Sequence, residues 1–135
     1  MIYYRNGYKN QLAESFEILT PIHPWKEIQT EFINLDEFGF LNIMAGYCWD
    51  GASGPTIDKP VNQILVPSLI HDAFCQLIRT GELTIPDARL QADKYFHTLL
   101  RERGMNPVRA WVWYRGVRYG ARHHRQKPKP ILEAL

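Results

Sequence analysis

Cysteine and long hydrophobic runs are both scarce in this chain of 135 residues. Its two cysteines, Cys48 and Cys75, are too few for a disulfide framework, which excludes the small cross-linked scaffolds typical of secreted proteins. No apolar run approaches the roughly 20 residues that cross a bilayer, and the first residues lack the apolar core of a secretory signal. We therefore expect reduced thiols and a protein that stays in the compartment where it is made.

An excess of one charge is also missing from the chain as a whole, whose formal net charge is +2. The distribution is nevertheless uneven. Residues 1–100 carry 7 Lys/Arg and 12 Asp/Glu, whereas residues 101–135 carry 9 and 2. We predict a single domain over residues 1–122, followed by a basic, proline-containing tail over residues 123–135. Such a tail is either a solvated extension or a contact to nucleic acid or an anionic membrane surface.

The apolar pattern changes from strand-like to helical near the middle of the chain, after a turn-rich loop at Asp50–Lys59. Short alternating runs come first, at residues 15–20, 27–35 and 38–47, with a hairpin turn at 36–39. Helical spacing and capping residues then predict helices over about 67–80, 84–103 and 108–122. The sequence thus predicts an α+β fold, an N-terminal antiparallel β-meander followed by three α-helices.

Two polar residues on inward-facing helical positions carry the strongest chemical signal. His71 shares a helix face with the apolar Phe74, and Asp93 lies on the apolar stripe of the next helix. A buried carboxylate is costly unless a hydrogen-bond donor meets it. Because a tight turn makes the two helices antiparallel neighbours, we predict that His71 and Asp93 hydrogen-bond to each other.

Simpler interpretations of the same residues stay open. His71 can be a core histidine whose hydrogen bonds are satisfied, and Asp93 can pair with Arg89 at an exposed edge of its helix. Cys75, one turn after His71, can be a nucleophile or a small buried hydrophobe. Ser53, in the turn-rich loop, does not stand in a nucleophile-elbow motif and is expected to be a turn residue.

A periodic stripe on the third predicted helix is expected to be its packing face. The stripe consists of Trp111, Tyr114, Val117 or Arg118, and Ala121. Because the neighbouring segment is basic, an alternative role for the aromatic side chains of this helix is to stack on nucleic-acid bases, through Trp113 or Tyr119.

Four short strings occur in order along the chain: Trp49–Pro55, His71–Phe74, Ala92–Phe96 and Tyr114–Gly120. In this combination they resemble an uncharacterised phage and prophage family, the domain-of-unknown-function family 1353. The resemblance implies a phage protein, located in the cytoplasm of the bacterial host or in the virion. It brings no activity with it.

The same order of residues also resembles the prokaryotic phospholipases A2. That resemblance implies that His71 is a general base and that Asp93 holds its imidazole in the right tautomer. It further implies a Ca²⁺ ion bound by Asp50, Asp72 and loop carbonyls near Gly51. The chain departs from these enzymes at Cys75, where they usually have tyrosine, and it lacks their bridging cysteines.

These observations lead us to expect a metal-assisted hydrolase that acts on a phospholipid-like or small ester. The alternative is a non-catalytic phage protein, in which the polar cluster merely ties the loop to the helices. In that case the basic C-terminal part would dock on a virion protein, a host protein or nucleic acid.

Overall fold

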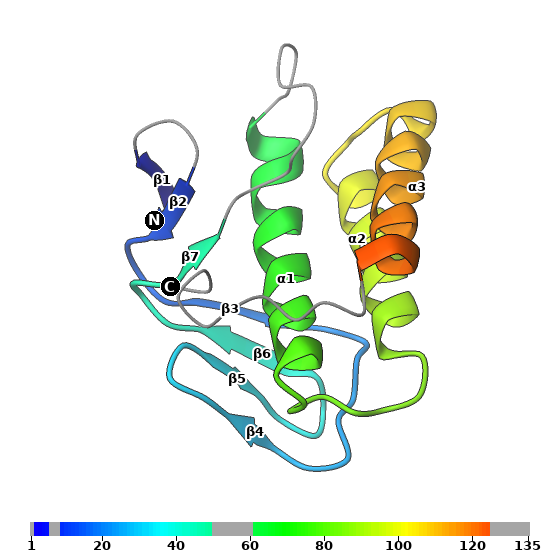
Figure 1. The fold of residues 1–135 in the computed structure, drawn as a ribbon. Helices are drawn as coiled ribbons and strands as arrows, with labels where there is room; N and C mark the ends of the chain where they lie inside the picture. Colours follow the sequence, from blue (N-terminus) through cyan, green and yellow to red (C-terminus); the bar gives the residue numbers. More distant parts are fainter. Residues whose placement is uncertain (1, 6–8, 50–60, 125–135) are drawn as a thin grey trace.

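The computed structural model describes residues 2–5, 9–49 and 61–124, with side chains over residues 11–49 and 63–121. Antiparallel strands come first and three helices follow, which confirms the predicted α+β fold (Figure 1). The larger sheet has the order β3-β6-β5-β4. Its strands are β3 (Phe16–Leu19), β4 (Ile28–Gln29), β5 (Ile33–Leu35) and β6 (Phe40–Ile43).

A second, smaller sheet has the order β1-β2-β7 and is also antiparallel. It consists of β1 (Ile2–Arg5), β2 (Lys9–Leu12) and β7 (Cys48–Trp49). Strands β1 and β2 precede the predicted meander, so the sequence pattern did not indicate them. The end of β7 is fastened to the first helix, because the indole Nε1 of Trp49 donates to Ser68 Oγ at 3.1 Å.

The single strand predicted over residues 27–35 is wrong, because a tight turn divides it into β4 and β5. Thr30 Oγ1 closes this turn by accepting from the Ile33 amide at 2.9 Å and donating to the Ile33 carbonyl at 2.7 Å. Asn34 Oδ1 accepts from the Thr30 amide at 3.2 Å. Side-chain oxygens of this kind compete with a continuous strand. The turn predicted at residues 36–39 is confirmed, with Asp36 Oδ1 accepting from two backbone amides.

The three helices are α1 (Val61–Arg79), α2 (Ala88–Glu102) and α3 (Pro107–His124). Helix α1 begins before the predicted start and contains Pro67, because burial of Ile64 and Leu65 outweighs the backbone hydrogen bond that proline cannot make. Helix α2 begins later than predicted, because Asp87 adopts a left-handed backbone conformation and makes no side-chain cap. Asn106 caps the start of α3, because its Oδ1 accepts from the Val108 and Arg109 amides at 2.8 and 3.3 Å.

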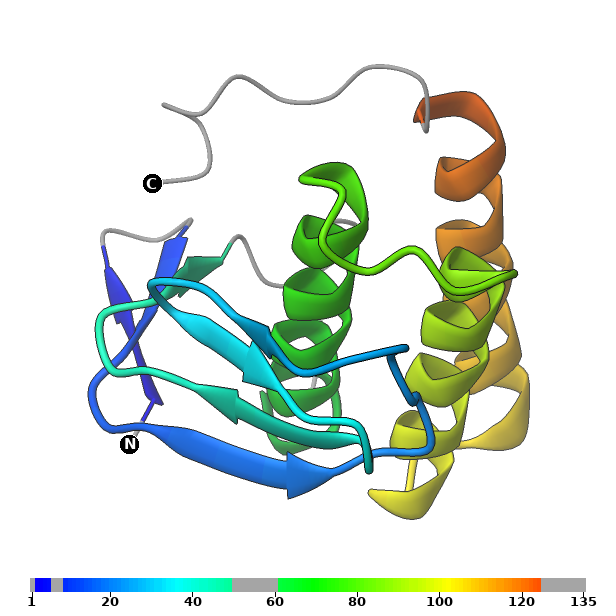
Figure 2. The same ribbon diagram turned by 90° about the horizontal axis from the view of Figure 1, so that it is seen from below.

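Helix α1 lies between the sheet and the pair formed by α2 and α3, as both ribbon views show (Figures 1 and 2). One buried cluster joins the sheet to α1 and includes Ile33, Leu41, Leu69 and Phe74. A second cluster lies among the helices and consists of Ile64, Phe96, Leu100, Met105 and Ala110. The described part of the chain contains no helix that is long and apolar enough to span a membrane.

The packing face predicted for the third helix is wrong at Trp111, which is 56 % exposed. The buried side of α3 is instead marked by Ala110 and Ala121, with Trp113 and Val117 partly buried beside them. The predicted stripe was therefore out of phase at its start, because an aromatic side chain does not by itself mark the buried side of a helix. Helix α3 continues to His124, and the predicted loop at residues 50–59 and tail residues 125–135 lie outside the described residues.

Candidate functional site

The sequence places His71 on α1 and Asp93 on α2, and a short connection returns the chain so that the two helices run antiparallel (Figure 1). Gly81, with φ of 80°, allows the left-handed conformation that ends α1. The result is a bond of 2.6 Å between His71 Nε2 and Asp93 Oδ1. The predicted contact between these two side chains is therefore confirmed.

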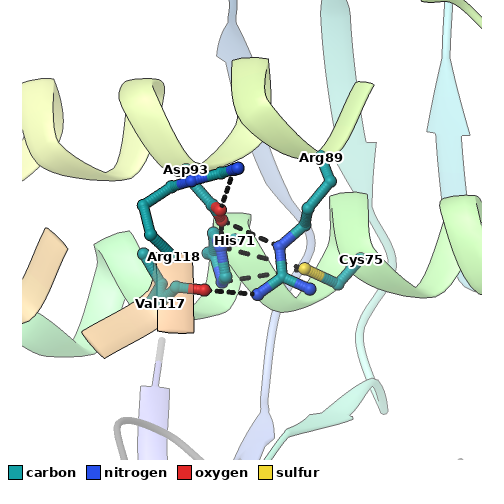
Figure 3. A network of polar contacts seen from close by, with 6 residues as sticks. All are labelled: His71, Cys75, Arg89, Asp93, Val117 and Arg118. Carbon is teal, nitrogen blue, oxygen red and sulfur yellow. Dashed lines mark hydrogen bonds and ion pairs between the residues drawn. The ribbon is translucent and has the colours of Figure 1, made fainter. Parts of the chain in front are cut away.

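Asp93 is the centre of a wider network, which also contains two arginines (Figure 3). Arg89 Nε donates to Asp93 Oδ1 at 2.9 Å, and Arg118 Nη1 donates to Oδ2 at 2.7 Å. Arg89 Nη2 also donates to the backbone carbonyl of Val117 at 3.0 Å. One carboxylate thus receives donors from α1, α2 and α3.

Burial makes these contacts more important than surface ion pairs. Asp93 is 0 % exposed and His71 is 8 % exposed, whereas the arginines are about 30 % exposed and reach solvent with part of their side chains. Burial alone would raise the pKa of Asp93, but the hydrogen bonds from His71 and Arg89 outweigh it and hold this pKa below its ordinary value. The carboxylate is therefore ionised throughout the physiological range.

The histidine responds in the opposite direction. Burial works to lower the pKa of His71, but the electrostatic influence of Cys75 and the hydrogen bond to Asp93 outweigh it and raise this pKa to about 10. At neutral pH the imidazole is therefore a cation that donates its Nε2 proton to Asp93. The imidazole of His71 can accept a proton only after it has lost one, which happens as the pH rises toward 10.

Cys75 and Phe96 complete the immediate surroundings of the imidazole. Cys75 Sγ lies 3.8 Å from both ring nitrogens of His71, one helical turn along α1. The ring of Phe96 lies 5.0 Å from the imidazole, centroid to centroid. The thiol is buried, so the sulfur and the imidazole share an environment from which solvent is largely excluded.

The predicted calcium ligands are only partly represented in the structure. Asp72 is half-buried on α1, adjacent to His71 in the chain. Asp50 and Gly51 lie outside the described residues. Among the residues that are described, no group of three or more His, Cys, Asp or Glu side chains is placed to hold a metal ion. A calcium site made by Asp50, Asp72 and Gly51 remains a prediction.

Sequence reasoning missed the role of Arg118 and misjudged that of Arg89. In the alternative interpretation Arg89 paired with Asp93 at an exposed edge, but the carboxylate of this pair is fully buried and is shared with His71. For Arg118 a signal existed, because this residue was one of two candidates for the inward-facing stripe of its helix. A buried carboxylate with a single donor was also a sign that further cations would be needed.

Comparison with known proteins places this chain in a family without assigning an activity. A model of the family described as "Protein of unknown function (DUF1353)" matches residues 27–117 and thus includes His71, Arg89 and Asp93. No curated protein and no solved structure matches the chain. Because the match covers well over half of the residues, the chain belongs to DUF1353, a family of proteins of unknown function.

Proposed function

We propose that this protein hydrolyses an ester bond, with His71 as general base and Asp93 as the positioning residue. The observation that carries the proposal is the 2.6 Å bond between His71 Nε2 and Asp93 Oδ1. A carboxylate on one ring nitrogen fixes the ring and leaves the other nitrogen, Nδ1, to accept a proton. Arg89 and Arg118 hold this carboxylate in turn, so the orientation of the imidazole is set by three helices.

In the proposed reaction His71 Nδ1 takes a proton from water while the water oxygen bonds to the ester carbonyl carbon. The bond from that carbon to the alkoxy oxygen then breaks, and the imidazolium returns the proton to the departing oxygen. A carboxylic acid and an alcohol leave. Because the pKa of His71 is raised to about 10, only a small neutral fraction is available at neutral pH, and the rate should climb with pH toward that value.

The substrate class and the cofactor follow from the resemblance to the phospholipases A2. A phospholipid-like ester is the proposed substrate, and a phage origin belongs to the same proposal. A calcium ion on Asp50, Asp72 and carbonyls near Gly51 would polarise the ester carbonyl when bound. Asp72, which follows His71 directly in α1, is the part of this ligand set that the structure describes.

A second candidate is a non-catalytic protein in which the network serves as a clamp between helices. The observation that favours it is that an arginine binds each oxygen of Asp93. Oδ1 accepts from Arg89 as well as from His71, and Oδ2 accepts from Arg118. Such a clamp would stabilise the fold and leave the function to a surface elsewhere on the molecule, for example one that docks on a virion or host protein.

Turnover of p-nitrophenyl butyrate and of phosphatidylcholine vesicles, with calcium and with a chelator, separates the two candidates. We expect His71→Gln to lower the rate by roughly two to four orders of magnitude. His97→Gln is the matched control, because His97 lies on α2 in contact with Tyr114, at 5.5 Å between ring centroids, and outside the Asp93 network. Thermal unfolding followed by circular dichroism verifies that each variant is folded.

The pH profile of the unaltered protein is a second test that needs no variant. A rate that rises with pH up to about 10 supports His71 as the base. Absence of turnover on both substrates, or equal rates for His71→Gln and His97→Gln, would refute the hydrolase and favour the clamp.

A further inference from the structure

Helix α3 has an exposed stripe of apolar side chains along its outer side. The stripe contains Val108, Trp111, Val112 and Tyr119, which are 70 %, 56 %, 58 % and 61 % exposed. Their spacing of i, i+3, i+4 and i+11 puts them on one side of the helix, opposite the buried Ala110 and Ala121. Arg115 lies in the same row and stacks on Trp111, with its guanidinium carbon 5.5 Å from the ring centroid. We call these five exposed residues the α3 stripe.

The charged residues of α3, the helix that bears the α3 stripe, are all of one sign. Helix α3 carries four arginines, at positions 109, 115, 118 and 122, and no carboxylate. Residues 11–49, which include the larger sheet, carry six carboxylates and one lysine. The sheet and α3 lie on opposite sides of α1 (Figures 1 and 2). The molecule is therefore electrically polarised, with its positive end at the exposed apolar side chains.

We propose that the α3 stripe binds the surface of an anionic membrane. Tryptophan and tyrosine are favoured at the boundary between headgroups and acyl chains. Val108 and Val112 would bury their exposed aliphatic surface at the same boundary. Arginines beside such a stripe pair with lipid phosphates. Helix α3 would lie along the surface, with the acidic sheet turned away from the lipid.

Two other occupants fit the same surface less well. If a second copy docked through the same stripe, two α3 helices would face each other. Each carries arginines and no carboxylate, so the like charges would oppose the contact. A nucleic acid would pair with the arginines, but the exposed valines would gain little from phosphates and sugars. The combination of aliphatic, aromatic and cationic side chains is what selects a lipid surface.

Binding to ether-linked lipids tests this proposal without depending on the proposed hydrolysis, because such lipids contain no ester bond to cleave. We expect the protein to co-sediment with vesicles of ether-linked phosphatidylglycerol and phosphatidylcholine. Binding to vesicles of ether-linked phosphatidylcholine alone should be much weaker. Added salt should weaken the binding to the anionic vesicles.

Surface variants locate the binding site. Replacing Trp111 and Val112 together by serine should weaken binding by about tenfold or more, and Arg115→Gln should weaken it by roughly fivefold. Trp25→Ser is the matched control, because Trp25 is 71 % exposed but lies between β3 and β4, within the acidic residues 11–49. Its binding should equal that of the unaltered protein. All of these side chains are exposed, so the variants should fold.

Several results would overturn the proposal. Failure to bind anionic vesicles at low salt would do so, as would equal losses in the Trp25 and Trp111/Val112 variants. The stripe would be assigned to a second copy if the protein bound no vesicles and eluted as a dimer in size-exclusion chromatography, while the Trp111/Val112 variant eluted as a monomer. Tight RNA or DNA binding that competes with the vesicles and depends on Trp111 would assign it to nucleic acid.

Discussion

Arg118 on α3 binds Asp93 on α2 through the carboxylate oxygen that His71 does not use, at 2.7 Å from Nη1 to Oδ2. The opposite oxygen, Oδ1, receives both His71 and Arg89. A carboxylate with a lone histidine would be an ordinary pair between two helices. Because Arg118 binds the same carboxylate, Asp93 also holds the third helix. Replacing Asp93 should therefore weaken the contacts among all three helices.

Replacing Asp93 by asparagine should destabilise the protein more than any other change in the network. The variant leaves His71, Arg89 and Arg118 without the negative charge they surround, and breaking a buried ion pair in this way costs about 3–5 kcal/mol. The measurement is the free energy of unfolding in urea. Glu17→Gln, on an exposed position of β3, should change it by less than about 0.5 kcal/mol. A small loss for Asp93→Asn would show that the network carries little stability.

Removing Arg118 should be milder, and its effect should depend on Asp93. Arg118→Met leaves Asp93 with two donors, and the arginine is 29 % exposed, so we expect a loss of about 1 kcal/mol. A double-mutant cycle with Asp93→Asn should give a coupling energy of at least about 0.5 kcal/mol, with the double variant losing less than the sum. Additive losses would contradict a direct interaction.

Stability should fall as the solution becomes alkaline. The pKa of His71 in the folded state, about 10, lies above the ordinary 6.5, so the folded state binds this proton more tightly. The contribution is complete below about pH 6.5 and is lost as the pH rises toward 10. Urea unfolding between pH 6 and pH 10 measures the slope. His71→Gln should flatten it, and an unchanged slope in that variant would assign the effect to another group.

Two glycines with positive φ provide a comparison of steric and conformational costs. A Cβ at Gly39 would lie 2.2 Å from the Thr20 carbonyl oxygen, so backbone would have to move, whereas at Gly81 nothing lies within 4 Å. Gly81→Ala should cost about 1 kcal/mol for the left-handed conformation. Gly39→Ala should cost clearly more. Equal melting temperatures for the two variants would contradict this explanation.

The helical half was the more predictable part of the fold from sequence. Helical spacing put His71 and Asp93 on facing sides of two helices, and a buried carboxylate needs a donor, so their contact followed from local pattern and elementary electrostatics. The boundaries were less accurate. The predicted first helix started at Pro67, whereas α1 starts at Val61, because the side chains of Ile64 and Leu65 pack into the core.

The spacing of apolar residues did not predict features that depend on side-chain hydrogen bonds or on partners on other elements. The turn at Thr30 arises from side-chain bonds that alternation of apolar residues does not record. Helical spacing put Trp111 in one stripe with Tyr114 and Ala121, which predicts a buried side chain, yet Trp111 is exposed. Arg118 reaches Asp93 from 25 positions away, and the spacing on its own helix left open whether it or Val117 faces inward.

The bond from Arg89 to the Val117 carbonyl has a consequence for how related sequences can vary. Because this bond is made to the backbone, it persists whichever side chain occupies position 117. Positions 89, 93 and 118 are different, since both arginines pair with the one carboxylate at position 93. A relative that replaces the aspartate with a neutral residue should also have lost its arginines, so these three positions should co-vary among members of the family.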